Sequence, residues 1–200
     1  MRESPRRSPS SKGLILGASR SELHNVTGNL PENPWAVFYS RHLMADRELQ
    51  QRLQDFVEYR LEHLDDDEKG EAQLFLDHLF QAFGHEGTRQ AGARHETRIR
   101  KRDTRRVSFA DLVWERRLLL EMKKTGEQLG RHYQQAFEYW LNLTPARTDY
   151  VVLCNFDELW IYDLNRQLEE PVDRVEISDL PQRWESLAFM LPEPLEPVPK

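Results

Sequence analysis

Two short apolar segments, FADLV (109–113) and LLLEM (118–122), are separated by the polar sequence WERR. This pattern predicts two neighbouring strands joined by a tight hairpin. A hairpin of this length returns Glu121 to the neighbourhood of Asp111. Because side chains alternate between the two faces of a strand, Glu121 and Lys123 are expected to point to the same side. The chain is therefore expected to fold around a sheet on which two carboxylates and one ammonium group converge.

These three residues have the chemistry of a divalent cation site. Two neighbouring carboxylates repel each other, and apolar residues flank both, so a bound cation would offset the cost of their charges. Carboxylate oxygens suit Mg²⁺, with Mn²⁺ as a substitute, which makes Asp111 and Glu121 the predicted metal ligands. Lys123 could then orient or deprotonate a water held by the ion, as hydrolysis of a phosphodiester requires. Ordinary strand-edge charges remain the alternative, since an acid followed by Glu-x-Lys arises easily by chance.

The order of elements along the chain predicts the fold class. Helical spacing of apolar residues runs from Asp46 to Leu64 and again from Glu71 to Phe83, and strand-like runs follow up to Lys123. Beyond these come an amphipathic helix after Gly126, the strand-like runs YVVLCNF and ELWIYDL, and a short helix within SDLPQRWESLAFML. We expect an α/β (α+β) fold with an N-terminal helical segment and a central mixed β-sheet flanked by helices.

Composition along the chain predicts the domain limits. Residues 1–34 are rich in Ser, Pro, Gly and Arg and are expected to be a disordered leader. Residues 35–190 are expected to form one domain, with a helical part at 35–84 and a catalytic core at 95–190. The proline-rich stretch 191–200 is expected to be a tail or linker.

Charge and cysteine content narrow the function classes. The formal net charge of −6 argues against a protein that coats nucleic acid indiscriminately, although a local basic surface can still bind phosphates. A lone cysteine, Cys154, cannot form an internal disulfide, so the reducing cytoplasm is the expected location. No apolar run approaches the roughly 20 residues that span a bilayer, so no membrane association is expected. The seven histidines lack the spacing of zinc ligands.

A basic segment, 88–106, leads directly into the predicted site. Such a run is usually a solvated surface, but because it leads into the predicted site, a surface that binds nucleic-acid phosphates is an equally good interpretation. It does not discriminate DNA from RNA, because phosphate contacts are common to both. The candidate DNA-binding residues in and near it are Arg98, Arg100, Lys101, Arg102, Arg105, Lys124 and Arg131.

Three helical residues are further candidates for the site. Gln135 and Tyr139 are four residues apart, hence on one face of their helix, where they could hydrogen-bond a phosphate or brace the metal ligands. An ordinary polar flank is the alternative for this pair. Glu71 begins the second predicted helix, where an acid favours the helix dipole, and a second role at the metal site is an option.

Taken together, the motif D-x9-E-M-K followed by Gln-x-x-x-Tyr resembles the PD-(D/E)xK core of restriction nucleases. Residues 70–191 are similar to the N-terminal cleavage domain of MmeI-like, type IIL restriction–modification enzymes, through the stretches FLDHLFQAFGHEG, RLLLEMKKTG, HYQQAFEYWLNL and YVVLCNFDELWIYDL. The resemblance implies a restriction-endonuclease-like core. It implies that Asp111 and Glu121 bind Mg²⁺, that Lys123 positions the attacking water, and that Gln135, Tyr139 and Glu71 assist the site.

The resemblance also implies partners. Such enzymes continue into an adenine methyltransferase and a target-recognition domain, and no Asn-Pro-Pro-Tyr-like motif occurs here. We therefore expect a DNA endonuclease domain that serves a methyltransferase or target-recognition partner, or a shortened enzyme, and a homodimer is compatible with it. Two alternatives stay open: a catalytically inactive module that binds DNA or the methyltransferase on a nuclease scaffold, and a nuclease acting on RNA.

Overall fold

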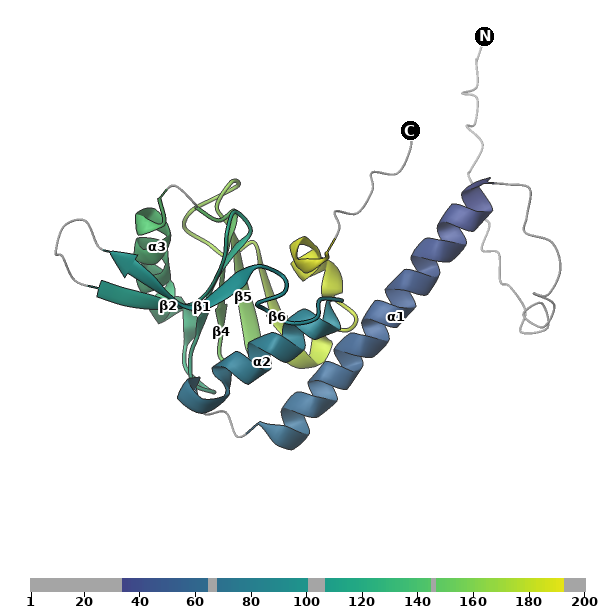
Figure 1. Ribbon diagram of the computed structural model, residues 1–200, viewed down its shortest axis with the longest axis horizontal. Helices are drawn as coiled ribbons and strands as arrows, with labels where there is room; N and C mark the ends of the chain where they lie inside the picture. Colours follow the sequence, from purple (N-terminus) through teal and green to yellow (C-terminus); the bar gives the residue numbers. More distant parts are fainter. Residues whose placement is uncertain (1–33, 65–67, 101–106, 145–146, 193–200) are drawn as a thin grey trace, which may run out of the picture. The chain divides into compact units, whose positions relative to one another are not determined.

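The computed structural model describes residues 34–64, 68–100, 107–144 and 147–192 (Figure 1). Its contacts divide the chain into two units, Met1–Arg41 and His42–Lys200, and the features below belong to the second unit, apart from the first residues of α1 (34–41). The predicted leader and tail lie almost entirely outside the described residues. None of the helices in the described ranges is both long enough and apolar enough to cross a membrane.

The helices broadly follow the predicted pattern, but three of the described segments form 3₁₀ turns. Gly130 contacts the indole of Trp160, where a Cβ would lie 3.0 Å from the ring, and the amphipathic helix becomes regular only at Tyr133. The predicted final short helix is present as 3₁₀ turns, in which Trp184, Leu187 and Met190 are buried at three-residue spacing. The helices are α1 (Pro34–His63), α2 (Glu68–Ala82), η2 (Leu129–His132), α3 (Tyr133–Asn142), η3 (Ile177–Asp179) and η4 (Trp184–Met190).

A six-stranded mixed sheet forms the centre of the described fold, as predicted. Its spatial order is the same as its sequence order, and every neighbouring pair is antiparallel except β3 and β4, which are parallel. The parallel pair needs a crossover, and η2 and α3 supply it. The strands are β1 (Ala93–Arg100), β2 (Val107–Trp114), β3 (Leu118–Met122), β4 (Tyr150–Cys154), β5 (Glu158–Asp163) and β6 (Asp173–Glu176).

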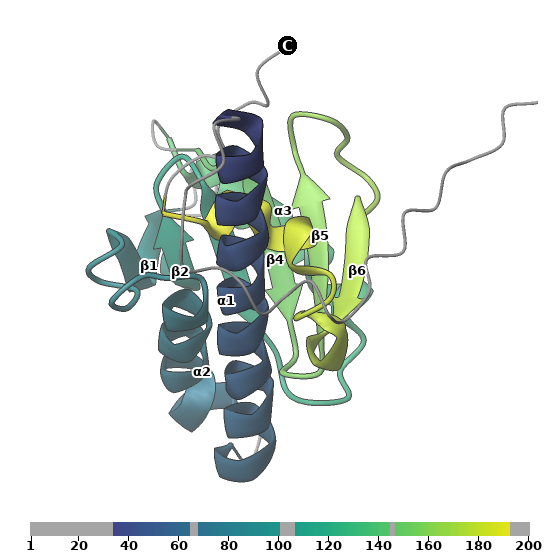
Figure 2. The same ribbon diagram turned by 90° about the vertical axis from the view of Figure 1, so that its right-hand side faces the viewer.

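Helices cover both faces of the sheet, with α1 and α2 on one side and α3 on the other (Figure 2). The alternation of side chains along β3 divides the core between them, so that Leu120 packs in the cluster beneath α1 and α2. Its neighbour Leu119 packs with Leu129 and Ala136 beneath α3. Because both faces are covered, all five residues of β3 are buried, and a charged residue in this strand is removed from water.

The β1–β2 ladder bends at Asp111. His95 pairs with Leu112 and Thr97 pairs with Ala110, so Glu96 and Asp111 lie opposite each other between these pairs. Leu112 packs in the α1–α2 cluster whereas Ala110 packs beneath α3, although residues two apart in a regular strand share a face. Glu96 has a φ of 45° at this point. The bend therefore sets the direction of the backbone that carries Asp111.

Candidate active site

The hairpin register places Asp111 and Glu121 across from each other. Starting from the turn, β2 and β3 pair as Trp114–Leu118, Val113–Leu119 and Leu112–Leu120. The next pair in this register would be Asp111 and Glu121. In place of a further ladder bond, Asp111 Oδ2 accepts a hydrogen bond of 2.7 Å from the Met122 backbone N–H. The first carboxylate is thus fixed to the strand of the second.

Lys123 joins this pair from the same side of β3. Its Nζ lies 3.4 Å from Glu121 Oε2, and the two residues are only 8% and 2% exposed. The Lys123 backbone N–H donates to the Cys154 carbonyl at 2.7 Å, which extends the β3–β4 pairing by one residue. The structure therefore brings together Asp111, Glu121 and Lys123, the three residues on which the sequence-based hypothesis depends.

The electrostatics of this cluster show a deficit of positive charge. Burial, and then the neighbouring Asp111 carboxylate, raise the pKa of Glu121 to about 8, although Lys123 opposes the shift. Burial also raises the pKa of Asp111 above its ordinary value, against the opposing effects of the Met122 N–H and Lys123. Glu121 Oε1 is buried without a hydrogen-bond partner among the described residues. One further cation would satisfy this oxygen and lower both pKa values.

Mg²⁺ fits this donor set. It is commonly bound by one or two carboxylates together with water and substrate phosphates, and Asp111 and Glu121 supply two carboxylates. In the described ranges no group of three or more His, Cys, Asp or Glu residues gathers in a way that could hold a metal. A structural zinc site, which needs four protein ligands, is not formed by these residues.

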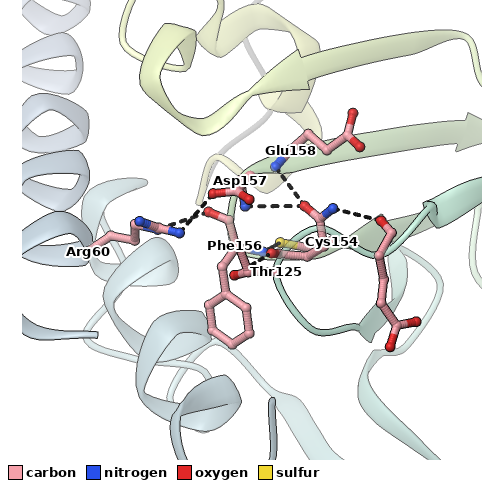
Figure 3. A network of polar contacts seen from close by, with 8 residues as sticks. Arg60, Thr125, Cys154, Phe156, Asp157 and Glu158 are labelled. Carbon is pink, nitrogen blue, oxygen red and sulfur yellow. Dashed lines mark hydrogen bonds and ion pairs between the residues drawn. The ribbon is translucent and has the colours of Figure 1, made fainter. Parts of the chain in front are cut away.

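The loop that follows Lys123 is tied to the β4–β5 turn (Figure 3). Thr125 Oγ1 donates to the Asn155 carbonyl at 3.3 Å, and the Asn155 side-chain amide donates to the Glu127 carbonyl at 2.9 Å. Arg60 of α1 binds the turn from the other side, donating to the Phe156 carbonyl and to Asp157. These contacts fix the backbone at the end of β3, from which Lys123 extends.

Gln135 and Tyr139 lie on α3, which covers the face toward which Glu121 points. The Gln135 side-chain amide donates to the Tyr139 hydroxyl at 2.8 Å, so the predicted common face is correct. Tyr139 is buried in the cluster beneath α3, and Gln135 is exposed. A direct role for either residue at the cation site stays a prediction.

Glu71 lies on α2, half-buried, and its assisting role also stays a prediction. A different acid of α2, Asp77, is linked by hydrogen bonds through Thr88 to His95, which lies near Asp111. No sequence spacing identifies this chain of contacts, because it joins a helix, a loop and a strand.

The described basic candidates are all exposed. Arg98 and Arg100 lie on β1, Lys124 follows β3, and Arg131 lies in η2. Lys101, Arg102 and Arg105 lie outside the described residues. Positive charge thus lies on the edge strand β1, whose partner β2 carries Asp111.

Comparisons with known proteins place this geometry in context. The sequence model of the family described as "MmeI, N-terminal domain" matches residues 45–198. Among solved structures, the chain is similar to a cryoEM structure of a DrdV–DNA complex, with 19% sequence identity and a TM-score of 0.44. That match covers 76% of this chain and 14% of the other, so this chain spans about one seventh of that relative. No curated protein matches.

Proposed function

Because this chain belongs to the MmeI N-terminal domain family, we propose that it is a Mg²⁺-dependent nuclease domain that hydrolyses DNA phosphodiester bonds in a restriction–modification system. The observation that carries the proposal is the burial of the Glu121 carboxylate beside a second acid. Glu121 is 2% exposed, its carboxyl group lies beside a second acid, and one carboxyl oxygen has no partner among the described residues. A carboxylate placed this way is costly in a protein that binds no cation.

The residues of the cluster have distinct roles in this proposal. Asp111 and Glu121 would hold the ion, which when bound supplies Lewis-acid stabilisation of phosphate charge and lowers the pKa of a bound water. The Lys123 ammonium, held against Glu121, would orient the attacking water and stabilise the charge that develops on it. Burial strengthens these electrostatic effects, because they act where little water screens them.

The proposal is tested by incubating the purified chain with supercoiled plasmid and Mg²⁺ or Mn²⁺. We expect nicked or linear DNA with either cation and intact plasmid in EDTA. Single-stranded RNA of matched length is the comparison substrate and should be cleaved more slowly than DNA. If DNA is bound but never cut, with or without an added methyltransferase partner, and calorimetry detects no cation uptake, the inactive-scaffold alternative holds instead.

The DNA-facing surface in this proposal is the basic arm, formed by residues 97–100 of β1 and 107–110 of β2. Arg98 is paired across the strands with Phe109, and Arg100 with Val107, and all four side chains are exposed. Phe109 is 56% exposed, which is unusual for a phenylalanine, whereas Ile99 faces the other way and is buried. Arginines beside an exposed aromatic ring suit contact with phosphates and bases.

Replacing both Arg98 and Arg100 by alanine should weaken DNA binding about tenfold near physiological salt, because two phosphate contacts are lost. The slope of log affinity against log salt concentration should decrease by about two. Fluorescence anisotropy with EDTA present measures the DNA affinity and its salt dependence, because the DNA is not cleaved without a divalent cation. Arg166→Ala, which removes an exposed arginine after β5, is the matched control and should change neither quantity. Equal losses in the control and the double variant would exclude a specific role for the arm.

A methyltransferase or target-recognition partner, and a homodimer, stay predictions from the family resemblance. In this proposal a partner region supplies the sequence recognition. Mixing the chain with a cognate methyltransferase should then restrict cleavage to particular sites.

A further inference from the structure

A partly buried chain of hydrogen bonds connects α2 to β1, the strand before the active site. The Thr88 hydroxyl lies 2.5 Å from Asp77 Oδ1, and the Thr88 backbone N–H donates to the same oxygen at 2.9 Å. On its other side, the Thr88 hydroxyl oxygen lies 2.8 Å from His95 Nε2. Thr88, at the centre of this chain, is 1% exposed, and Asp77 and His95 are half-buried. The chain of contacts reaches from α2 to His95, the residue immediately before the bend opposite Asp111.

The direction of this chain follows from the donors available. Burial alone would raise the pKa of Asp77, but the two hydrogen bonds from Thr88 and the nearby His95 outweigh it and hold that pKa below its ordinary value. Asp77 is therefore an ionised acceptor, and the Thr88 hydroxyl donates its single proton to it. The hydroxyl oxygen can then only accept, so His95 Nε2 carries a proton and donates. The ring of His95 is thereby held in one orientation.

The residue after His95 has an unusual backbone conformation. Glu96 has a φ of 45°, which non-glycine residues adopt at a cost in free energy. It lies opposite Asp111, between the pairs His95–Leu112 and Thr97–Ala110, where the strands bend. A strained conformation of this kind persists only where neighbouring contacts hold it. The anchored ring of His95 provides such a contact.

His95 also lies beside Asp111 across the β1–β2 ladder. It pairs with Leu112, the residue after Asp111, and the next residue of its own strand, Glu96, lies opposite Asp111. The two residues are thus close neighbours across the bent β1–β2 ladder. Movement of His95 would therefore displace the backbone of Asp111, the first of the two proposed cation ligands.

We propose that His95, anchored by Thr88 and Asp77, is a positioning residue that holds β1 bent at Glu96 and so directs Asp111 toward Glu121. The inference rests on the proposed function, since the purpose of this geometry is to form the cation site. His95 does not touch the reacting atoms in this proposal. It acts by fixing the backbone from which Asp111 extends, so its loss changes the placement of that carboxylate.

The first test measures the placement of Asp111 without any metal. In the native chain, Asp111 Oδ2 accepts the Met122 N–H, so exchange of that amide hydrogen reports whether the carboxylate is in place. Thr88→Val keeps the shape of the side chain and removes the hydroxyl. We expect Met122 to exchange at least about tenfold faster in this variant, relative to the amide of Leu120 in the same strand. Thr148→Val is the matched control, because Thr148 is a buried threonine that donates to Tyr150 at the opposite end of the sheet.

The second test measures binding of Mn²⁺ alone to the full chain by calorimetry. Thr88→Val and Asp77→Asn should each weaken binding about fivefold or more, and the double variant should be no weaker than the single ones, because both break one chain. Thr148→Val should bind within about twofold of the native chain. Unchanged Met122 exchange in Thr88→Val, or an equal effect of Thr148→Val, would overturn the inference.

A rescue experiment separates positioning from general damage. Glycine adopts a positive φ without strain, so Glu96→Gly in the Thr88→Val background should recover most of the Mn²⁺ affinity. Glu96→Gln removes the same charge but keeps the strain, and should recover less. If the native chain itself binds no Mn²⁺, the proposed function fails, while the Met122 exchange result still decides the role of His95.

Discussion

Replacing Lys123 by methionine will lower kcat for DNA cleavage by about 10³-fold while leaving DNA affinity within about threefold of the native value. Methionine keeps most of the buried volume of the lysine stem but removes the ammonium group. That group lies 3.4 Å from Glu121 Oε2, where it would stabilise the attacking water. A single-turnover assay at saturating Mn²⁺ measures kcat, and anisotropy in EDTA measures affinity.

Lys124→Met provides the contrast for this prediction, because Lys124 is the next residue and is exposed. As a phosphate-binding candidate, it should lower DNA affinity with little change in kcat. Asp111→Asn should share the kcat defect of Lys123→Met and additionally lose cation affinity. Residual cleavage at the same rate in Lys123→Met and Asp111→Asn as in the native chain would mean that the active site lies elsewhere.

Replacing Glu121 by glutamine will stabilise the cation-free protein at alkaline pH. The pKa of Glu121 is raised from an ordinary 4.5 to about 8 in the fold, so between these values the native state binds more protons than the unfolded state. Stability of the native chain therefore falls as pH rises through this window, by an amount on the order of 5 kcal/mol. Glutamine does not titrate. Its stabilising effect should be near zero at pH 4, grow through the window and level off above pH 8.

Urea denaturation in EDTA at several pH values checks this prediction. Because Lys123 loses its charged partner in Glu121→Gln, we expect a net gain of about 1–3 kcal/mol at pH 8.5 rather than the full linkage value. Glu169→Gln, which replaces an exposed glutamate, is the control variant and should change the free energy of unfolding little. Added Mg²⁺ should stabilise the native chain increasingly as pH rises, since the cation displaces a proton, and should leave Glu121→Gln unchanged. A Glu121→Gln effect independent of pH would contradict the assigned cause.

The hairpin that carries the two acids could be predicted because its register depends only on residues that are close together in the sequence. The lengths of the apolar runs and the intervening WERR determine the register that brings Asp111 opposite Glu121. The mixed sheet and its flanking helices followed from the order of strand-like and helical segments, and the family resemblance was correct. Patterns of this kind depend on neighbouring residues, which a single sequence displays directly.

Features that depend on tertiary contacts could not be predicted in the same way. The delayed start of α3 reflects the contact of Gly130 with Trp160, 30 residues later in the chain. The chain from Asp77 through Thr88 to His95 joins three elements without a recognisable motif, and His95 by itself had no ligand spacing. Strand β6, with one buried residue among four, has too little apolar pattern to be recognised.

The parallel pairing of β3 with β4 has a consequence for the order in which the parts of the candidate site form during folding. The two acids lie within one contiguous stretch, 111–121, so they can approach each other as soon as that hairpin closes. Lys123 is different, because its backbone is secured by the carbonyl of Cys154, which arrives only after the whole crossover through α3 is in place. If the proposed function holds, the site for the ion and the placement of Lys123 would therefore form at separate stages of folding, and the later stage depends on contacts between residues far apart in the sequence.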